Sequence, residues 1–385
     1  MNPTRFGIVG IGNMGNPHVK RFLENEIPGA IVTAVCDQDP AALLAFPQIK
    51  GWTSSAEMIR SGEIDALLIA TPHYSHVPIG IDALQNGLHV LCEKPLAVHK
   101  ADCQRLLAAH TNPKQIFGLM FNNRTEPVYQ KLKAFIAAGE LGAVTRINWT
   151  LTHWFRSNAY YTSSAWRATW EGEGGGLLVN QLPHDLDLFQ WIFGLPSRVR
   201  AFCPIGKYHP IEVEDEINAI LEYPDGKTAI LVGSTGEAPG VDRREIVGDL
   251  GRIIVHPDRL QFFRNTIPAS EFCRTTKESF AKPDFEEISI PVERSGGQHS
   301  EIVRQFVSAI QNGTPLLANA SEGTASVELG NAIILASQQD RTVDLPLDAV
   351  AFEKWLQTKR DSSNYNAAGG NAPRVVADLT SSFGR

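Results

Sequence analysis

A glycine pattern directly after a predicted strand constrains the fold of this chain most. Residues 5–10 read R-F-G-I-V-G, an apolar run typical of a buried strand, and it leads into the spacing G-x-G-x-x-G. In such a loop the first glycine permits a tight turn, the second lets the backbone approach a pyrophosphate, and the third lets the next helix pack closely. That helix presents its N-terminal N–H groups to the phosphates. We predict a dinucleotide-binding loop made of Gly10, Gly12, Asn13, Met14 and Gly15.

An acidic residue ends the second predicted strand. Residues 30–36 read A-I-V-T-A-V-C, and Asp37 follows them. A carboxylate at this position can accept hydrogen bonds from an adenosine ribose and repels a 2′-phosphate. The alternative is that Asp37, like Asp39 before Pro40, is only a turn residue at a strand end. We predict that Asp37 binds the ribose and that the cofactor is NAD rather than NADP.

Two further predicted strands end in polar residues. Residues 66–70 lead into Thr71-Pro72 and then His76, and an apolar run from residue 88 stops at Glu93-Lys94-Pro95. In an open parallel sheet, ligands bind just beyond the carboxyl ends of the strands. A lysine placed there can point at whatever the sheet binds, although a lone lysine in a turn is more often a surface residue. His76 has an equally simple interpretation as a residue at a helix N-terminus.

A glycine-rich stretch in the middle of the chain carries histidine and carboxylate side chains. Residues 174–189 read G-G-G-L-L-V-N-Q-L-P-H-D-L-D-L-F, and Pro183 suits the first turn of a helix. Asn180, His184 and Asp187 have the spacing i, i+4, i+7, which predicts one helical stripe. A histidine near the start of such a helix can face a cleft and act as a general base. The alternative makes Asn180 an N-cap, His184 a hydrogen-bonded core residue and Asp187 a structural partner.

Tryptophan and tyrosine are concentrated between residues 149 and 170. Aromatic faces next to polar groups suit a sugar ring, which offers C–H faces for stacking and hydroxyls for hydrogen bonds. We expect Trp149, on a predicted strand, to pack behind a sheet. The predicted substrate contacts, most of them in a loop, are Tyr160, Tyr161, Trp166, Arg167, Asn180 and His184.

The Glu-Lys-Pro stretch downstream of the glycine loop, together with the G-G-G…H-x-x-D stretch, resembles the glucose–fructose oxidoreductase/inositol dehydrogenase (Gfo/Idh/MocA) family. The resemblance covers roughly residues 5–347. It implies that Lys94 is catalytic and precedes a cis proline, and that His184 is the acid/base. It also implies that the loops containing Thr71, Pro72, His76, Glu93 and Lys94 line the cofactor site.

One position departs from the pattern of that family. The family carries G-G-G-x-L-x-D-x-x-x-H-x-x-D, with a catalytic Asp where this chain has Asn180. An asparagine can orient a hydroxyl or the histidine, but it cannot share a proton or raise the pKa of the histidine by its charge. We therefore expect His184 to act as acid/base without an Asp–His dyad, with Asn180 in a supporting catalytic role.

Composition excludes several classes of partner. The net charge of -7 argues against nucleic-acid or anionic-membrane binding, and no apolar run approaches the length of a membrane span. The chain runs from its first residues directly into a strand, without the apolar segment of a signal peptide. Five scattered cysteines without C-x-x-C spacing suit a reducing compartment. We expect a cytoplasmic protein without a metal site.

These observations predict an α/β fold in three parts. Residues 1–123 would form a Rossmann domain with a doubly wound parallel sheet, and residues 361–385 an extended tail. Residues 124–360 would form an α+β domain with a large, open, mostly antiparallel sheet, which in the family commonly makes homodimers or homotetramers.

The predicted activity is NAD-dependent oxidation of a secondary hydroxyl of a sugar, glycoside or cyclitol, with Lys94 and His184 catalytic. Alternatives on the same scaffold are reduction of a keto-sugar and oxidation that primes a glycoside for elimination. A non-enzymatic nucleotide- or sugar-sensing regulator is a further alternative. Lys94 and His184 argue against a regulator, because a sensor needs no proton acceptor.

Overall fold

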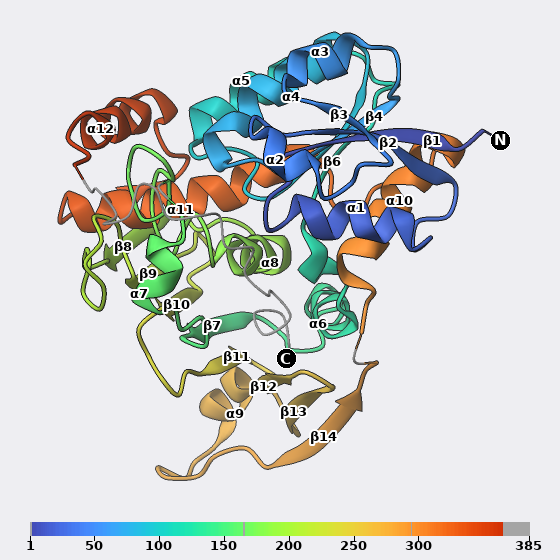
Figure 1. Ribbon diagram of the computed structural model, residues 1–385. Coiled ribbons are helices and arrows are strands. Elements are labelled where there is room, and N and C mark those ends of the chain that lie inside the picture. The colour runs from blue at the N-terminus through green and yellow to red at the C-terminus, as the bar shows by residue number, and fades with distance from the viewer. Residues whose placement is uncertain (1, 165, 294, 365–385) are drawn as a thin grey trace.

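The computed structural model describes residues 2–164, 166–293 and 295–364, which form two β-sheets with helices packed around them (Figure 1). The predicted C-terminal tail lies outside the described residues from position 365 onward. Within the described ranges, no helix is both long and apolar enough to cross a membrane.

The first sheet is parallel throughout and has the strand order β3-β2-β1-β4-β5-β6. This is the doubly wound Rossmann order, in which the direction of winding reverses between β1 and β4. The predicted fold class of the N-terminal part is therefore confirmed. Its strands are β1 (Thr4–Val9), β2 (Ala30–Cys36), β3 (Lys50–Trp52), β4 (Ala66–Ile69), β5 (His89–Cys92) and β6 (Phe117–Leu119).

Helices cover this sheet, and one of them comes from late in the chain. The early helices are α1 (Gly15–Leu23), α2 (Pro40–Leu43), α3 (Ser55–Arg60), η1 (His73–Ser75), α4 (His76–Gln85) and α5 (Lys100–Ala108). Helix α10 (Gln298–Asn312) joins them, because Ile302, Val303 and Phe306 are buried in the same hydrophobic core as the strands. The core of the nucleotide domain thus needs residues far beyond its own sequence segment.

The second sheet has nine strands in the order β14-β13-β12-β11-β7-β10-β9-β8-β15, and only β7 and β10 pair in parallel. The predicted large and mostly antiparallel sheet is confirmed. Its strands are β7 (Val144–Leu151), β8 (Arg198–Phe202), β9 (Glu216–Glu222), β10 (Thr228–Ser234), β11 (Asp242–Gly248), β12 (Gly251–His256), β13 (Arg259–Asn265), β14 (Phe285–Pro291) and β15 (Val343–Asp344).

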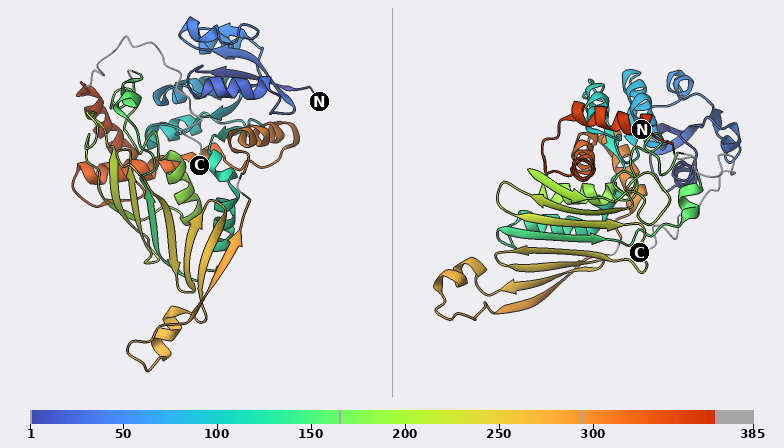
Figure 2. Two further views of the ribbon diagram at one scale, coloured as in Figure 1. Left: turned by 60° about the horizontal axis from the view of Figure 1, so that its bottom comes forward. Right: turned by 90° about the vertical axis from the view of Figure 1, so that its left-hand side faces the viewer.

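Helices pack on one face of this sheet, as Figure 2 shows. Trp149 on β7 is fully buried there and contacts Phe189 of α8 with ring centroids 5.2 Å apart, so its predicted role in the core is confirmed. The opposite face is open, and the burial of successive residues alternates along β9 and β10, as expected for a sheet with one covered face. The remaining helices are η2 (Asn122–Thr125), α6 (Pro127–Ala137), α7 (Asn158–Thr162), α8 (Pro183–Phe193), α9 (Ala269–Thr275), η3 (Ala320–Glu322), α11 (Gly323–Gln338) and α12 (Ala349–Asp361).

Candidate active site

The glycine loop between β1 and α1 has the geometry of a phosphate cradle. Gly10 has φ +89°, which favours glycine, and a Cβ on Gly15 would lie 1.8 Å from the carbonyl oxygen of Gly10. A Cβ on Gly12 would meet nothing within 4 Å. Gly10 and Gly15 therefore shape the turn, while the backbone around Gly12 is open to a ligand. These features fit a dinucleotide pyrophosphate at the N-terminus of α1.

Asp37 at the end of β2 supports this loop directly. Its carboxylate accepts hydrogen bonds from the N–H of Ile11 (2.8 Å) and from the N–H of Asp39 (2.9 Å). A carboxylate accepts about four hydrogen bonds, so these two are compatible with ribose hydroxyls as additional donors. The residue is thus both a loop anchor and the predicted ribose contact, and the ribose contact stays a prediction.

Two loops at neighbouring strand ends are joined by His76, which is 1% exposed. Its Nδ1 lies 2.8 Å from the carbonyl oxygen of Pro95, and its Nε2 lies 2.9 Å from that of Thr71. Burial lowers the pKa of His76, and a neutral ring can donate to only one of these two acceptors. His76 therefore holds the Thr71-Pro72 loop against the Lys94-Pro95 loop, and its predicted contact with the cofactor remains a prediction.

The Lys94–Pro95 peptide bond is cis, as the family resemblance implied. Directly before it, Glu93 is buried, and its Oε2 accepts a hydrogen bond from the N–H of Lys94 (3.2 Å). The other carboxylate oxygen of Glu93 lies 2.8 Å from Nε2 of His18, a buried residue on α1. Glu93 thus links the glycine-loop helix to the lysine loop.

The protonation of the His18–Glu93 pair follows from a third residue. Arg21 can only donate, and its guanidinium lies 3.4 Å from Nδ1 of His18, so Nδ1 is the acceptor and Nε2 carries the proton given to Glu93. Burial alone would raise the pKa of Glu93, but the hydrogen bond from His18 and nearby positive charge lower it to about 2. Glu93 is therefore ionised next to Lys94. The sequence analysis missed His18, although its place three residues after Gly15 was a usable signal.

Lys94 connects the two domains. The side chain is half-buried, and its Nζ donates a hydrogen bond of 2.8 Å to the carbonyl oxygen of Asn180. Burial lowers the pKa of Lys94 to about 8, and the charges of Arg167 and Arg156 act in the same direction, against Glu93 and Glu173. Such a lysine is still mostly protonated at neutral pH but titrates within the working range of an enzyme.

Asn180 lies in a turn before helix α8, not on the helix. Its N–H donates to the carbonyl oxygen of Gly176 (3.0 Å), whereas the helix begins at Pro183. The predicted shared stripe of Asn180, His184 and Asp187 was therefore wrong for Asn180, because the proline starts a new helix instead of continuing an earlier turn. The side-chain amide of Asn180 donates to the carboxylate of Glu173.

Glu173 is a site residue that the sequence analysis missed. It is 1% exposed, and its second oxygen accepts the N–H of Ala168 (2.7 Å). Burial raises its pKa, partly offset by Arg167 and Lys94. The carboxylate therefore stands beside Asn180, the position where the family pattern has a catalytic Asp. Its place immediately before the triple glycine was the available signal.

Ion pairs fix helix α8, which carries His184 as its second residue. Asp185 accepts a hydrogen bond of 2.7 Å from the buried Arg244. Asp187 is held bidentately by the buried Arg124, at 2.6 and 2.7 Å. These contacts agree with the interpretation of Asp187 as a structural partner. His184 itself is 5% exposed, and the helix it belongs to follows the turn that Lys94 contacts.

The predicted aromatic loop is partly helical. Tyr160 and Tyr161 lie on α7, and Tyr161 is 4% exposed, with its hydroxyl 2.8 Å from the hydroxyl of Thr235. Placing Tyr161 in a loop was therefore wrong; it belongs to the hydrophobic core of the second domain. Tyr160 and Trp166 remain close to the site, since the Trp166 ring contacts His73 of η1, with centroids 5.5 Å apart.

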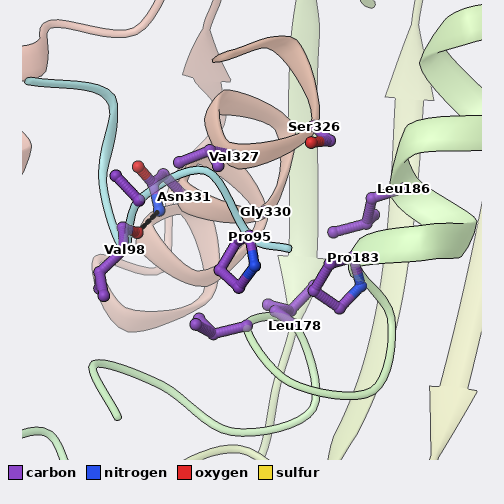
Figure 3. Close-up of a pocket in the computed structure, with 11 residues that line it drawn as sticks. Pro95, Val98, Leu178, Pro183, Leu186, Ser326, Val327, Gly330 and Asn331 are labelled. Atoms are coloured by element: carbon purple, nitrogen blue, oxygen red, sulfur yellow. Dashed lines mark hydrogen bonds between the residues drawn. The ribbon is translucent and has the colours of Figure 1, made fainter. Parts of the chain in front are cut away.

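A small pocket beside the site is a packing seam. Pro95, Pro183 and Leu178 come together there with Val327 and Gly330 of α11 (Figure 3). Most of its lining is apolar, and its two polar side chains, Ser326 and Asn331, already donate hydrogen bonds to the carbonyl oxygens of Gly323 and Val98. The seam fixes the loop after β5 and the start of α8 against the same helix. Lys94 and the turn before His184 thus share one rigid support.

Comparison with known proteins agrees with this geometry. A family model described as an oxidoreductase family with an NAD-binding Rossmann fold matches residues 4–121, and the model of the GFO/IDH/MocA C-terminal domain matches residues 129–254. The chain belongs to the Gfo/Idh/MocA oxidoreductase family. The resemblance found in the sequence is confirmed, and the protein is an oxidoreductase with an NAD-binding Rossmann domain.

Individual Gfo/Idh/MocA proteins match over most of the chain. The rhizopine catabolism protein MocA of Rhizobium meliloti is 26% identical over 341 residues, which cover 86% of this chain and 94% of that protein. An inositol 2-dehydrogenase of Salmonella typhimurium is 30% identical over 232 residues, covering 58% of this chain and 65% of that protein. The WlbA dehydrogenase of Chromobacterium violaceum, solved with NADH and UDP-GlcNAcA, has a TM-score of 0.78 at 25% identity, covering 90% and 97% of the two chains.

The choice between NAD and NADP can be tested at Asp37. We expect Asp37→Asn to reduce the preference for NAD by roughly tenfold, since one lost charge contact is worth about 1–1.5 kcal/mol. The asparagine keeps an oxygen for the N–H of Ile11, so the loop should survive. Binding of NADH and NADPH to both proteins, followed by nucleotide fluorescence, measures the effect. A wild type that binds the two nucleotides equally well would contradict the assignment.

Proposed function

We propose that this protein oxidises a secondary hydroxyl of a sugar, glycoside or cyclitol, with Lys94 and His184 as the catalytic residues. The observation that carries the proposal is the hydrogen bond from Lys94 Nζ to Asn180, because it joins the lysine loop to the turn that leads into His184. The names of the relatives, inositol 2-dehydrogenase and rhizopine catabolism protein, support a polyhydroxylated substrate.

Lys94 has the chemistry needed to stabilise an alkoxide. An ammonium group has three donors, and one of them is used on Asn180. A second donor can bind the reacting hydroxyl and stabilise the negative charge that develops on it in the transition state. The ionised Glu93 next to it favours the protonated lysine. Bound NAD supplies the hydride acceptor.

His184 would accept the hydroxyl proton. It stands on a helix whose rotation is fixed by the Asp185–Arg244 and Asp187–Arg124 pairs, so its position is defined before substrate binds. In the reverse direction the same residue would donate the proton to a ketone, which makes keto-sugar reduction the second candidate. Asn180, held by Glu173, would orient a neighbouring hydroxyl.

The test is a substrate panel. Purified protein with NAD is offered neutral sugars, cyclitols, glycosides and sugar acids, and NADH absorbance is recorded; keto-sugars with NADH test the reverse direction. Turnover of at least one member is the expected result. If NAD binds tightly but no panel member reacts in either direction, the proposed substrate class is wrong.

We also propose that the open face of the second sheet joins copies of the chain as a homodimer or homotetramer. Large apolar residues stand on it, among them Phe202, Ile220 and Ile230, which are 61%, 51% and 43% exposed. Such exposure along neighbouring strands is costly in water unless it is covered. Sedimentation as a monomer at micromolar concentration would rule this out.

A further inference from the structure

We infer that the substrate is a sugar acid and that Arg167 binds its carboxylate. This inference rests on the proposed function and names the substrate class of the same site. It starts from an arginine that is held rigidly near the catalytic lysine and forms no direct ion pair with a carboxylate in the described part of the chain.

Arg167 is fixed in place by aromatic side chains. Its guanidinium carbon lies 4.5 Å from the ring centroid of Tyr160 and 4.6 Å from that of Trp166. One terminal nitrogen donates to the hydroxyl of Tyr160 at 2.6 Å, and that hydroxyl also accepts from Gln181 at 3.1 Å. Stacking of this kind orients the planar group and lowers the entropy lost when it binds a ligand.

The hydrogen-bonding capacity of Arg167 is not used up. Its Nε is buried and has no acceptor among the described residues. The guanidinium also forms no ion pair with any carboxylate in the described part of the chain. Buried donors of charged groups are normally paired, because an unmet donor costs free energy. A ligand with acceptor oxygens would complete the arrangement.

Arg167 is close to the reacting centre. Trp166, which stacks on it, contacts His73 in the loop after β4, where the cofactor half of the site lies. The charge of Arg167 also contributes to the lowered pKa of Lys94, so the two cations are within electrostatic reach of each other. A hydroxyl on Lys94 and an anionic group on Arg167 can therefore belong to one small molecule.

The charge balance of the site favours an anion. Lys94, Arg156 and Arg167 all lie here, with Arg156 stacked on the same Tyr160 ring at 5.0 Å. Against them stand the ionised Glu93 and Glu173, and the oxygens of Glu173 already accept from Ala168 and Asn180. A neutral polyol would place no anion against Arg167. Arginine offers a planar pair of donors that matches the two oxygens of a carboxylate.

The experiment compares matched substrates and three variants. For each sugar in the panel, three substrates are compared: the neutral sugar, its uronic or aldonic acid, and its phosphate ester. We expect kcat/KM to favour the acid by at least about tenfold. Arg167→Gln should raise KM for the acid by roughly 30-fold or more, since truncating one partner of a buried charge pair costs that much, and should change KM for the neutral sugar little.

Two controls separate charge from fold. Arg167→Lys keeps the charge but loses the planar fork and should show an intermediate loss of the acid preference. Arg60→Gln removes an exposed arginine that pairs with Asp82 on the nucleotide domain, and it should leave all constants unchanged. NADH affinity and melting temperature show whether each variant is folded.

The outcomes are distinguishable from those that test the proposed function. If no substrate is turned over, the proposed activity is wrong. The inference is then tested by calorimetry, which measures whether gluconate or glucuronate binds to the enzyme–NADH complex. Equal constants for neutral and acidic sugars, or an equal effect of Arg167→Gln on both, would overturn it. Preference for the sugar phosphate would show that the anion is not a carboxylate, which also overturns it.

Discussion

Replacing His184 with alanine is expected to lower kcat for the preferred substrate by about 10²–10⁴-fold, the range typical of a lost general base. The cause is the missing acceptor for the hydroxyl proton, because Lys94 in its protonated form cannot accept it. NAD binding should be nearly unchanged, since the glycine loop and Asp37 belong to the other domain. Stopped-flow formation of NADH and a nucleotide titration measure the two quantities.

The dependence on pH gives a second measurement of the same residue. The kcat/KM of the wild type for oxidation should decrease at acidic pH, because a protonated imidazole accepts no proton. His184→Ala should not show this decrease. His110→Ala is the matched control: His110 lies just after α5, and its one side-chain hydrogen bond in the described structure is with the carbonyl oxygen of Gln115. Near-normal turnover of His184→Ala would place the proton acceptor elsewhere.

The nucleotide domain could be predicted well because its signals are local. The run before Gly10, the glycine spacing and the residues at the strand ends each depend on a few neighbouring positions, and the sheet order follows from right-handed crossovers. Helix α10 could not be assigned to this domain in the same way. Its apolar face fits many surfaces, and only the fold places Phe306 against β1 and its neighbours.

Strand β11 shows why the second domain was harder to predict. Its sequence, D-R-R-E-I-V-G, does not alternate between polar and apolar residues, so it carries no clear strand signal. The structure buries Arg244 and Glu245 because each has ionic partners on other elements: Arg244 pairs with Asp185 of α8, and Glu245 with Arg146 of β7. Pairs this distant in sequence leave no pattern in the strand itself.

The same reason explains the site residues that were missed. His18 and Glu93 are 75 positions apart, and their contact exists only when α1 and the end of β5 are adjacent in the sheet. Glu173 and Asn180 are close in sequence, but Asn180 was placed on one helical stripe with His184 and Asp187, so its contact with Glu173 was not expected. Residue types near the reaction could therefore be named from motifs, whereas the contacts that set their charge required the fold.

The charge of Lys94 is expected to determine the rate of oxidation. Lys94→Ala is expected to lower kcat by about 10²–10³-fold, because it removes the charge that stabilises the developing alkoxide. In the wild type, the pKa of about 8 means that Lys94 is a cation below this pH and loses its charge as the pH rises through it. Initial rates of oxidation should therefore decline above pH 8.

Lys94→Arg separates charge from geometry in this prediction. Arginine stays protonated across the whole range, so this variant should be slower than the wild type but should lack the alkaline decline. The double variant Lys94→Ala/His184→Ala should lose less than the product of the single losses, because both residues act on the same hydroxyl. An alkaline decline that persists in Lys94→Arg would assign it to another group, and a rate that rises through pH 8 would make neutral Lys94 the base.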